Sequence, residues 1–207
     1  GTKRTVVDVI HTPMDESSFP GLFVNQLPYG RLATPDGNFI FVTTQWRSIT
    51  KVVKIDINTG EVYQIRPVCS DEERSRIISQ HLLCVSDSGD LVITQSEPNA
   101  PPVFAFLSSK SLSNKDKDQS SDFIFEPVGV ISASSTFVPN RQEPTSFSYH
   151  VLKSKPSHGA DNGCIEGILL LPKNAEKKAP LIVVPHGGPH SCTSTSYIPS
   201  YAFLCNS

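Results

Sequence analysis

Two tight turns, each followed by a run rich in apolar residues, constrain the fold of this chain more than any other feature. Pro35-Asp36-Gly37 precedes residues 39–43, and Asp87-Ser88-Gly89 precedes residues 91–96. Proline presets φ in such turns, and glycine supplies the positive φ that they require. The second turn lies 51 residues beyond the first. This spacing predicts that a β-rich unit is repeated along the chain.

The first of these units is expected to contain three strands. Residues 39–43 are largely apolar, which is typical of a strand that is buried on both faces. Residues 53–57 alternate between Val or Ile and Lys or Asp, and Asn58-Thr59-Gly60 then predicts a tight turn. Residues 62–65 are expected to return as the third strand.

A second unit follows with the same order of strands and turns. Residues 82–85, 91–96 and 103–107 predict three more strands, with a proline-marked corner at 97–102. Because propeller blades repeat at roughly 40–50 residues, we expect residues 1–145 to form the C-terminal blades of a β-propeller. The alternative is a β-sandwich built from ordinary hairpins.

Three other segments are assigned within the same domain. Residues 4–10 alternate in hydrophobicity and are expected to form an outer strand of a preceding blade. Residues 123–125 and 128–131 are expected to complete the propeller. Residues 108–122 contain a single apolar side chain, which predicts a solvated surface loop without a functional role.

The composition excludes several classes of partner. The net charge of −2 leaves no basic excess to neutralise the phosphates of nucleic acid or an anionic membrane surface. No apolar run approaches the roughly 18 residues that a transmembrane helix needs. Five cysteines occur without a C-x-x-C pair, which favours free thiols in the cytoplasm over disulfides or a structural zinc site. We expect neither a metal nor a cofactor.

The character of the sequence changes towards its C-terminal end. Residues 148–153 and 164–172 predict two antiparallel strands, and residues 180–184 predict a third that leads directly into His186-Gly187-Gly188-Pro189. A strand followed at once by His-Gly-Gly is the arrangement by which α/β-hydrolases build half of an oxyanion hole. Backbone N–H groups there meet the negative charge that develops on an attacked carbonyl. Residues 146–207 are therefore expected to begin an α/β-hydrolase domain.

With these features, the chain resembles the prolyl-oligopeptidase family of serine peptidases, and most closely its acylaminoacyl-peptidase branch. The specific part is Pro185-His-Gly-Gly-Pro-His-Ser191, since related branches carry Tyr-Gly-Gly or Tyr-Ala-Gly-Pro at this place. Asn25-Gln-Leu-Pro-Tyr-Gly30 and residues 166–172 are also similar to the family. Residues 201–205 match it more loosely, as the start of the first hydrolase helix.

The resemblance implies a serine exopeptidase that releases an N-acylated amino acid from the N-terminus of short peptides. Its Ser-Asp-His triad lies in the hydrolase domain, and the propeller caps the site. The resemblance assigns to Gly188 a backbone N–H of the oxyanion hole, to Gly187 the turn of the loop, and to His186 a bracing role through side-chain hydrogen bonds. It also implies short N-acylated peptides as partners and a homo-oligomer of the full-length protein.

The residues that would create an oxyanion are not recognisable in the sequence. No serine has the flanking glycines of a G-x-S-x-G elbow, and the family's triad order places all three members beyond Ser207. We therefore expect an internal fragment that lacks the triad and is inactive alone. The alternatives are a non-catalytic propeller that acts as a binding module, or another peptidase of the prolyl-oligopeptidase family.

Other polar or reactive side chains receive structural assignments. Cys192 is expected to be an inert thiol, because no activating histidine or helix N-terminus can be assigned beside it. Trp46 is expected to pack in the interior, and Arg47 to be exposed. Four histidines are expected on the surface or on strands rather than in a triad: His11, His81, His150 and His158.

Overall fold

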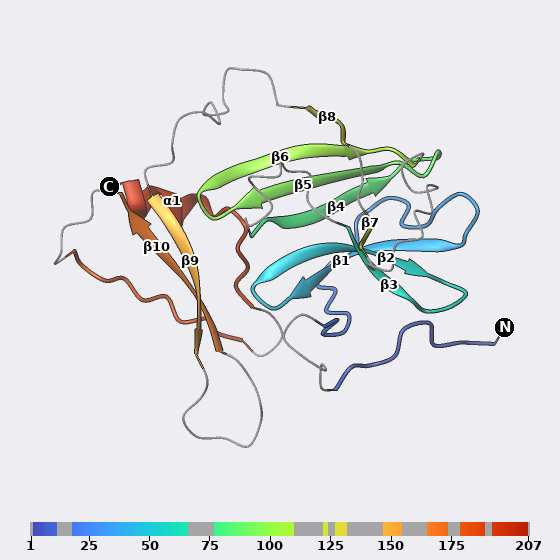
Figure 1. Ribbon diagram of the computed structural model, residues 1–207, viewed down its shortest axis with the longest axis horizontal. Helices are drawn as coiled ribbons and strands as arrows, with labels where there is room; N and C mark the ends of the chain where they lie inside the picture. The colour runs from blue at the N-terminus through green and yellow to red at the C-terminus, as the bar shows by residue number, and fades with distance from the viewer. Residues whose placement is uncertain are drawn as a thin grey trace.

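The described residues form small β-sheets and one short helix (Figure 1). They are those of a computed structural model, which describes residues 2–11, 18–65, 77–109, 122–123, 127–131, 147–154, 165–173, 179–188 and 192–206. Several sequence-based expectations lie outside these residues: most of the polar loop 108–122, His158, and residues 189–191 of the His-Gly-Gly-Pro-His-Ser motif.

Two four-stranded sheets make up the larger part of the structure. The first has the order β1 (Phe39–Trp46), β2 (Ile49–Asp56), β3 (Val62–Ile65) and β7 (Asp122–Phe123). Strands β1 to β3 are antiparallel, whereas β7 runs parallel to β3. These strands confirm the predicted first unit.

The second sheet repeats this up-and-down order. It contains β4 (Ser79–Val85), β5 (Leu91–Glu97), β6 (Ala100–Leu107) and β8 (Pro127–Ile131), all paired antiparallel. The two small sheets lie side by side in Figure 1, in an arrangement consistent with the predicted partial β-propeller.

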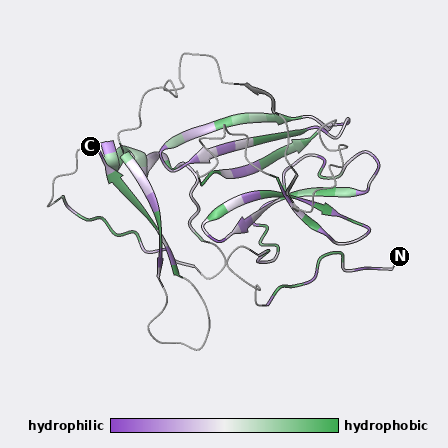
Figure 2. Ribbon diagram, in the orientation of Figure 1, coloured by the Kyte–Doolittle hydropathy of each residue, from purple (hydrophilic) through white to green (hydrophobic). Residues whose placement is uncertain are grey.

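One hydrophobic core is shared between the two sheets. Figure 2 shows hydrophobic stretches on strands of both. The buried residues of this core are Phe41, Val52 and Ile65 from the first sheet and Leu82, Val85, Leu91, Ile93, Ala105 and Leu107 from the second. Burying this much apolar surface from two sheets favours their association over their separate folding.

Strand β1 is buried on both of its faces, as its apolar sequence predicted. Phe41 belongs to the shared core, whereas its neighbour Val42 belongs to a second cluster with Trp46, Val53 and Ile55. The ring of Trp46 lies 5.6 Å from that of Phe19 between centroids. The expected packing role of Trp46 is therefore confirmed.

Two predicted strands are wrong. Residues 4–10 form no strand, although Val6 and Val7 pack against the second cluster; contact with that cluster holds them without a β-ladder. Residues 181–184 also form no strand, and their four side chains are 78%, 63%, 72% and 59% exposed. A run that is apolar on both faces needs neighbouring strands to bury it, and none of the described strands pairs with it.

The C-terminal part adds a hairpin and a helix. Strands β9 (Phe147–Ser154) and β10 (Ile165–Pro172) pair antiparallel, which confirms two predicted strands. Helix α1 (Pro199–Asn206) covers the segment expected to be helical and contacts β10. These described residues do not show the parallel sheet of an α/β-hydrolase.

A polar segment, residues 192–197, attaches this C-terminal part to the two sheets. The side chain of Thr195 is fully buried, its N–H donates to the Ser48 carbonyl at 2.7 Å, and its hydroxyl lies 2.9 Å from Ser79 Oγ. The Tyr197 N–H donates to Ser96 Oγ at 3.2 Å. The segment thus contacts the β1–β2 turn, the start of β4 and the end of β5.

Strand β9 makes a second attachment to the same sheet. The Tyr149 hydroxyl donates to Glu97 Oε2 at 2.9 Å, and the Asn99 side chain donates to the Phe147 carbonyl at 3.4 Å. Both partners on the sheet lie at the β5–β6 turn. The C-terminal part is therefore held at two separate places on the propeller-like sheets.

The tight turns predict different costs for two glycine substitutions. Gly37 and Gly60 both have positive φ, at 71° and 81°. A Cβ at Gly37 would meet no atom within 4 Å, whereas a Cβ at Gly60 would collide with the Val6 carbonyl oxygen. We expect Gly37→Ala to lower the free energy of unfolding by about 1–2 kcal/mol and Gly60→Ala by roughly 2–5 kcal/mol. Equal losses in urea denaturation would contradict the Val6 contact.

The buried hydroxyl of Thr195 gives a second prediction. Thr195→Val keeps the shape of the side chain but removes the donor and acceptor beside Ser79, so we expect a loss of about 1–3 kcal/mol in unfolding free energy. Thr195→Ser keeps the hydroxyl and should cost less than about 1 kcal/mol. Denaturant unfolding of both variants checks this, and a Val variant as stable as the Ser variant would show that the hydroxyl does not anchor the segment.

Candidate functional site

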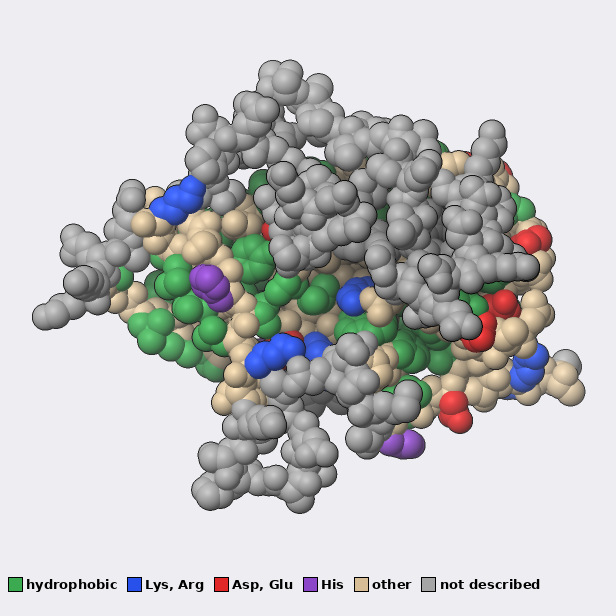
Figure 3. Space-filling model, viewed as in Figure 1, with side chains coloured by type: hydrophobic (Ala, Val, Ile, Leu, Met, Phe, Trp, Pro, Cys, Tyr) green, Lys and Arg blue, Asp and Glu red, His purple; other side chains and the backbone are tan. Residues whose placement is uncertain are grey.

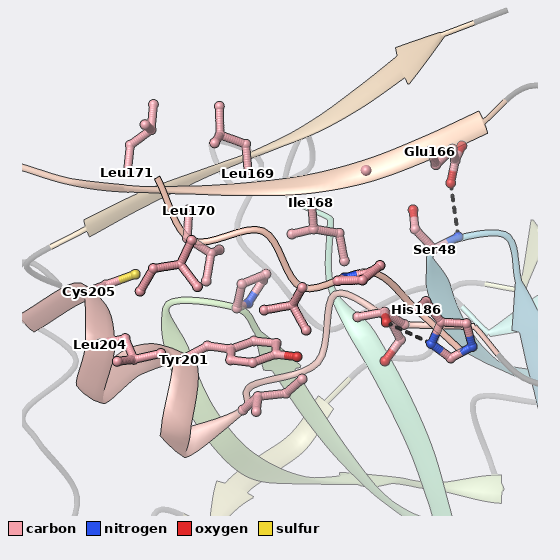
Figure 4. A pocket seen from close by; sticks show the side chains of 18 of the residues that line it. Ser48, Glu166, Ile168, Leu169, Leu170, Leu171, His186, Tyr201, Leu204 and Cys205 are labelled. Atoms are coloured by element: carbon pink, nitrogen blue, oxygen red, sulfur yellow. Dashed lines mark hydrogen bonds between the residues drawn. The ribbon is translucent and has the colours of Figure 1, made fainter. Parts of the chain in front are cut away.

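A cavity of about 790 Å³ lies where the C-terminal part meets the β1–β2 turn. Its walls come from β10, residues 179–186, residues 192–198 and helix α1, and most of the lining side chains are hydrophobic. In Figure 4, Ile168 and Leu170 point from β10 toward Tyr201 and Leu204 of α1, whereas Leu169 and Leu171 point to the other side of the strand. Such a cavity suits a ligand with apolar groups and few charges.

The His-Gly-Gly loop lies at this cavity. His186 is one of the lining residues, and Gly188 has φ of 94°. A Cβ at either Gly187 or Gly188 would meet no atom within 4 Å. Glycine is therefore favoured at position 188 by the positive φ and not by a lack of room for a side chain. The sequence placed the turn of the loop at Gly187, but the structure places the left-handed residue at Gly188.

The imidazole of His186 contacts the polar segment that attaches to the sheets. Its Nδ1 lies 3.3 Å from Thr193 Oγ1 (Figure 4). Thr193 stands two residues before the buried Thr195. His186 thus contacts the same segment whose Thr195 N–H donates to the Ser48 carbonyl of the β1–β2 turn.

The β1–β2 turn is held from three directions. The carbonyl of Arg47 accepts hydrogen bonds from Gln45 Nε2 and, at 3.2 Å, from Cys192 Sγ. The N–H of Ser48 donates to Glu166 Oε2 at 3.0 Å (Figure 4), and Glu166 Oε1 lies 3.9 Å from Lys153 Nζ. Strand β10 is thereby tied to the turn through a carboxylate.

Sequence reasoning missed the residues that build this junction. Glu166 is the only charged residue in β10, a signal that could have singled it out on an otherwise apolar strand. Ser48 and Thr195 carry no such signal, because each is one of many serines and threonines. Arg47 was expected to be exposed, but it is half-buried and lines the cavity.

The remaining reactive side chains take no recognisable catalytic position. Partial burial, and then the charge of Glu166, raise the pKa of the Cys192 thiol, which disfavours the thiolate and agrees with an inert cysteine. His11 and His150 are exposed, as expected. His81 lies on β4, where its Nε2 is 3.2 Å from Thr50 Oγ1 and 3.3 Å from Ser196 Oγ.

The described residues contain neither a metal-binding cluster nor a membrane-spanning helix. No group of three or more His, Cys, Asp and Glu side chains in this part of the chain could hold a metal ion. In the same residues, no helix is long and apolar enough to span a membrane.

Hydrophobic side chains gather on the surface beside the cavity. Figure 3 shows them over the left of the molecule, where Figure 1 draws β9, β10 and residues 179–188. Leu152, Ile165 and Leu171 are exposed there together with the run at 181–184.

Comparison with known proteins places the chain among acylamino-acid-releasing enzymes. An acylamino-acid-releasing enzyme 2 from Oryza sativa subsp. japonica is 27% identical over 97% of this chain and 25% of its own length. The acylamino-acid-releasing enzymes of Arabidopsis thaliana and Mus musculus are 28% and 29% identical, over 96% and 97% of this chain. The chain spans about a quarter of the length of these curated relatives.

A family model covers the two sheets themselves. Residues 2–134 match the model described as the N-terminal domain of acylamino-acid-releasing enzyme. These residues include β1 to β8 and exceed half of the chain. The chain therefore belongs to the acylamino-acid-releasing enzyme family.

Proposed function

We propose that the full-length protein containing this chain is a serine exopeptidase that releases an N-acylated amino acid from the N-terminus of short peptides. The names of the relatives support this activity. The observation in this chain that carries it is Gly188, a glycine with φ of 94° at the end of the His-Gly-Gly loop. A backbone N–H there can donate to a developing oxyanion.

The domain assignment is part of the same proposal. Residues 1–145 form blades of a β-propeller, and residues 146–207 form the first part of an α/β-hydrolase domain. The exposed apolar run at 181–184 supports this assignment, because a central strand of such a domain is apolar on both faces. The nucleophilic serine and the second oxyanion donor beside it belong to other parts of the full-length protein.

The cavity chemistry suits the proposed substrate. An N-acylated amino acid carries no ammonium group, so its acyl end can enter a mostly hydrophobic cavity without leaving a charge unpaired.

Cellular location and assembly remain predictions. The described cysteines Cys84, Cys192 and Cys205 are free thiols, which supports the proposed cytoplasmic location. A homo-oligomer of the full-length protein is expected from the family resemblance alone.

Substitution of Gly188 tests the proposed role of the loop. In the full-length protein, Gly188→Ala should lower kcat for an acetyl-alanyl chromogenic substrate by roughly 100- to 1,000-fold, because alanine resists φ near 94° and turns the N–H away from the oxyanion. KM should change little. Gly37→Ala is the matched control, since it imposes the same kind of backbone strain in a turn that does not line the cavity.

The same assay separates the enzyme from the alternative of a binding module. A full-length protein that folds but hydrolyses no acylated peptide would contradict the proposed activity. A Gly188→Ala variant with unchanged kcat would leave the activity standing and would remove this glycine from the oxyanion hole.

A further inference from the structure

The guanidinium of Arg47 has an unusual environment at the cavity. Its Nε is buried and has no hydrogen-bond partner, and no carboxylate among the described residues forms an ion pair with it. Arg47 is also one of the residues that line the cavity. A buried N–H without a hydrogen-bond partner is unfavourable, so a ligand that supplies an acceptor to Nε, and an anionic acceptor above all, would stabilise it.

The backbone of Arg47 is strained as well. Its φ of 57° makes it the only non-glycine residue with positive φ in the described part of the chain. An L-residue with a Cβ adopts this conformation at a cost, and such residues gather at functional sites. Hydrogen bonds from Gln45 and Cys192 to its carbonyl hold the conformation.

Glu166, the other charged residue that lines the cavity, has partners of its own. The carboxylate of Glu166 accepts from the Ser48 N–H and lies 3.9 Å from Lys153 Nζ. Its negative charge is therefore already offset by these two neighbours. The positive charge of Arg47 is left to attract an anionic group.

We propose that Arg47 binds the C-terminal carboxylate of the N-acylated peptide. Acylation removes the N-terminal ammonium, so this carboxylate is the charge that the main chain of every such substrate retains. The inference rests on the proposed function, because it takes the acylated end of the peptide to lie at Gly188. Arg47 then acts as a specificity-determining residue that favours peptides whose carboxylate reaches the β1–β2 turn.

Matched peptide acids and amides test this proposal. The substrates are N-acetylated di-, tri- and tetra-alanine, each as the free acid and as the C-terminal amide, with the full-length protein. We expect kcat/KM to be roughly 10- to 100-fold higher for the acid than for the amide, the range of a charge-assisted hydrogen bond. The preference should be largest at one peptide length, because Arg47 is held at one place.

Three variants locate the source of the preference. Arg47→Met retains a side chain on the strained backbone. It should lower kcat/KM for the peptide acid to the value for the peptide amide, because the amide does not use the charge of Arg47. Arg47→Lys should retain part of the preference, since it keeps the charge without the planar fork. Arg31→Met is the control, because Arg31 pairs with Asp87 at 3.2 Å and does not line the cavity; it should leave both substrates unchanged.

The outcomes distinguish this inference from the proposed function. Equal kcat/KM for acid and amide at every length in the wild-type protein would overturn the role of Arg47 while leaving the peptidase activity intact. A folded Arg47→Met variant that still has a higher kcat/KM for the acid than for the amide would also overturn the role of Arg47. If no peptide is hydrolysed, the proposed activity fails, and the dissociation constants of acid and amide from calorimetry decide whether Arg47 binds the carboxylate.

Discussion

Two backbone hydrogen bonds of one residue, Ser48, help to join the two parts of this structure. Its N–H donates to Glu166 of β10, and its carbonyl accepts from the N–H of the buried Thr195. The cavity exists because these two contacts bring β10 and residues 192–198 to the same turn. Together with the Cys192 thiol that donates to the Arg47 carbonyl, they fix β10 and the segment before α1 at the β1–β2 turn.

Much of the fold could be predicted because its determinants are local in sequence. The glycines at 37, 60 and 89 all have positive φ: the Gly37 turn leads into β1, and the other two turns join β2 to β3 and β4 to β5, as the sequence predicted. The two wrong strands, at 4–10 and 181–184, show the limit of that reasoning. Alternation reports that a segment can form a strand, but a strand also needs a partner with free backbone groups.

The candidate site was only partly predictable for a related reason. The His-Gly-Gly motif is contiguous, so it was visible in the sequence, and it lies at the cavity. The contacts that support it join residues far apart: 118 positions separate Ser48 from Glu166, and 116 separate Ser79 from Thr195. No periodicity links such pairs. The sequence predicted an exposed Arg47, because the burial of its Nε without a partner is visible only in the folded chain.

The shared core also bears on how the repeated units can diverge. Phe41, Val52 and Ile65 on one sheet fill the same interior as Leu91, Ile93 and Leu107 on the other. Because that interior is close-packed, the summed volume of its side chains is constrained. The size of any single side chain is less constrained. A larger residue in one repeat is tolerated when a smaller one appears in the other. The turns face no such joint constraint, so the two repeats retain their Asp-and-Gly punctuation while their strand sequences differ.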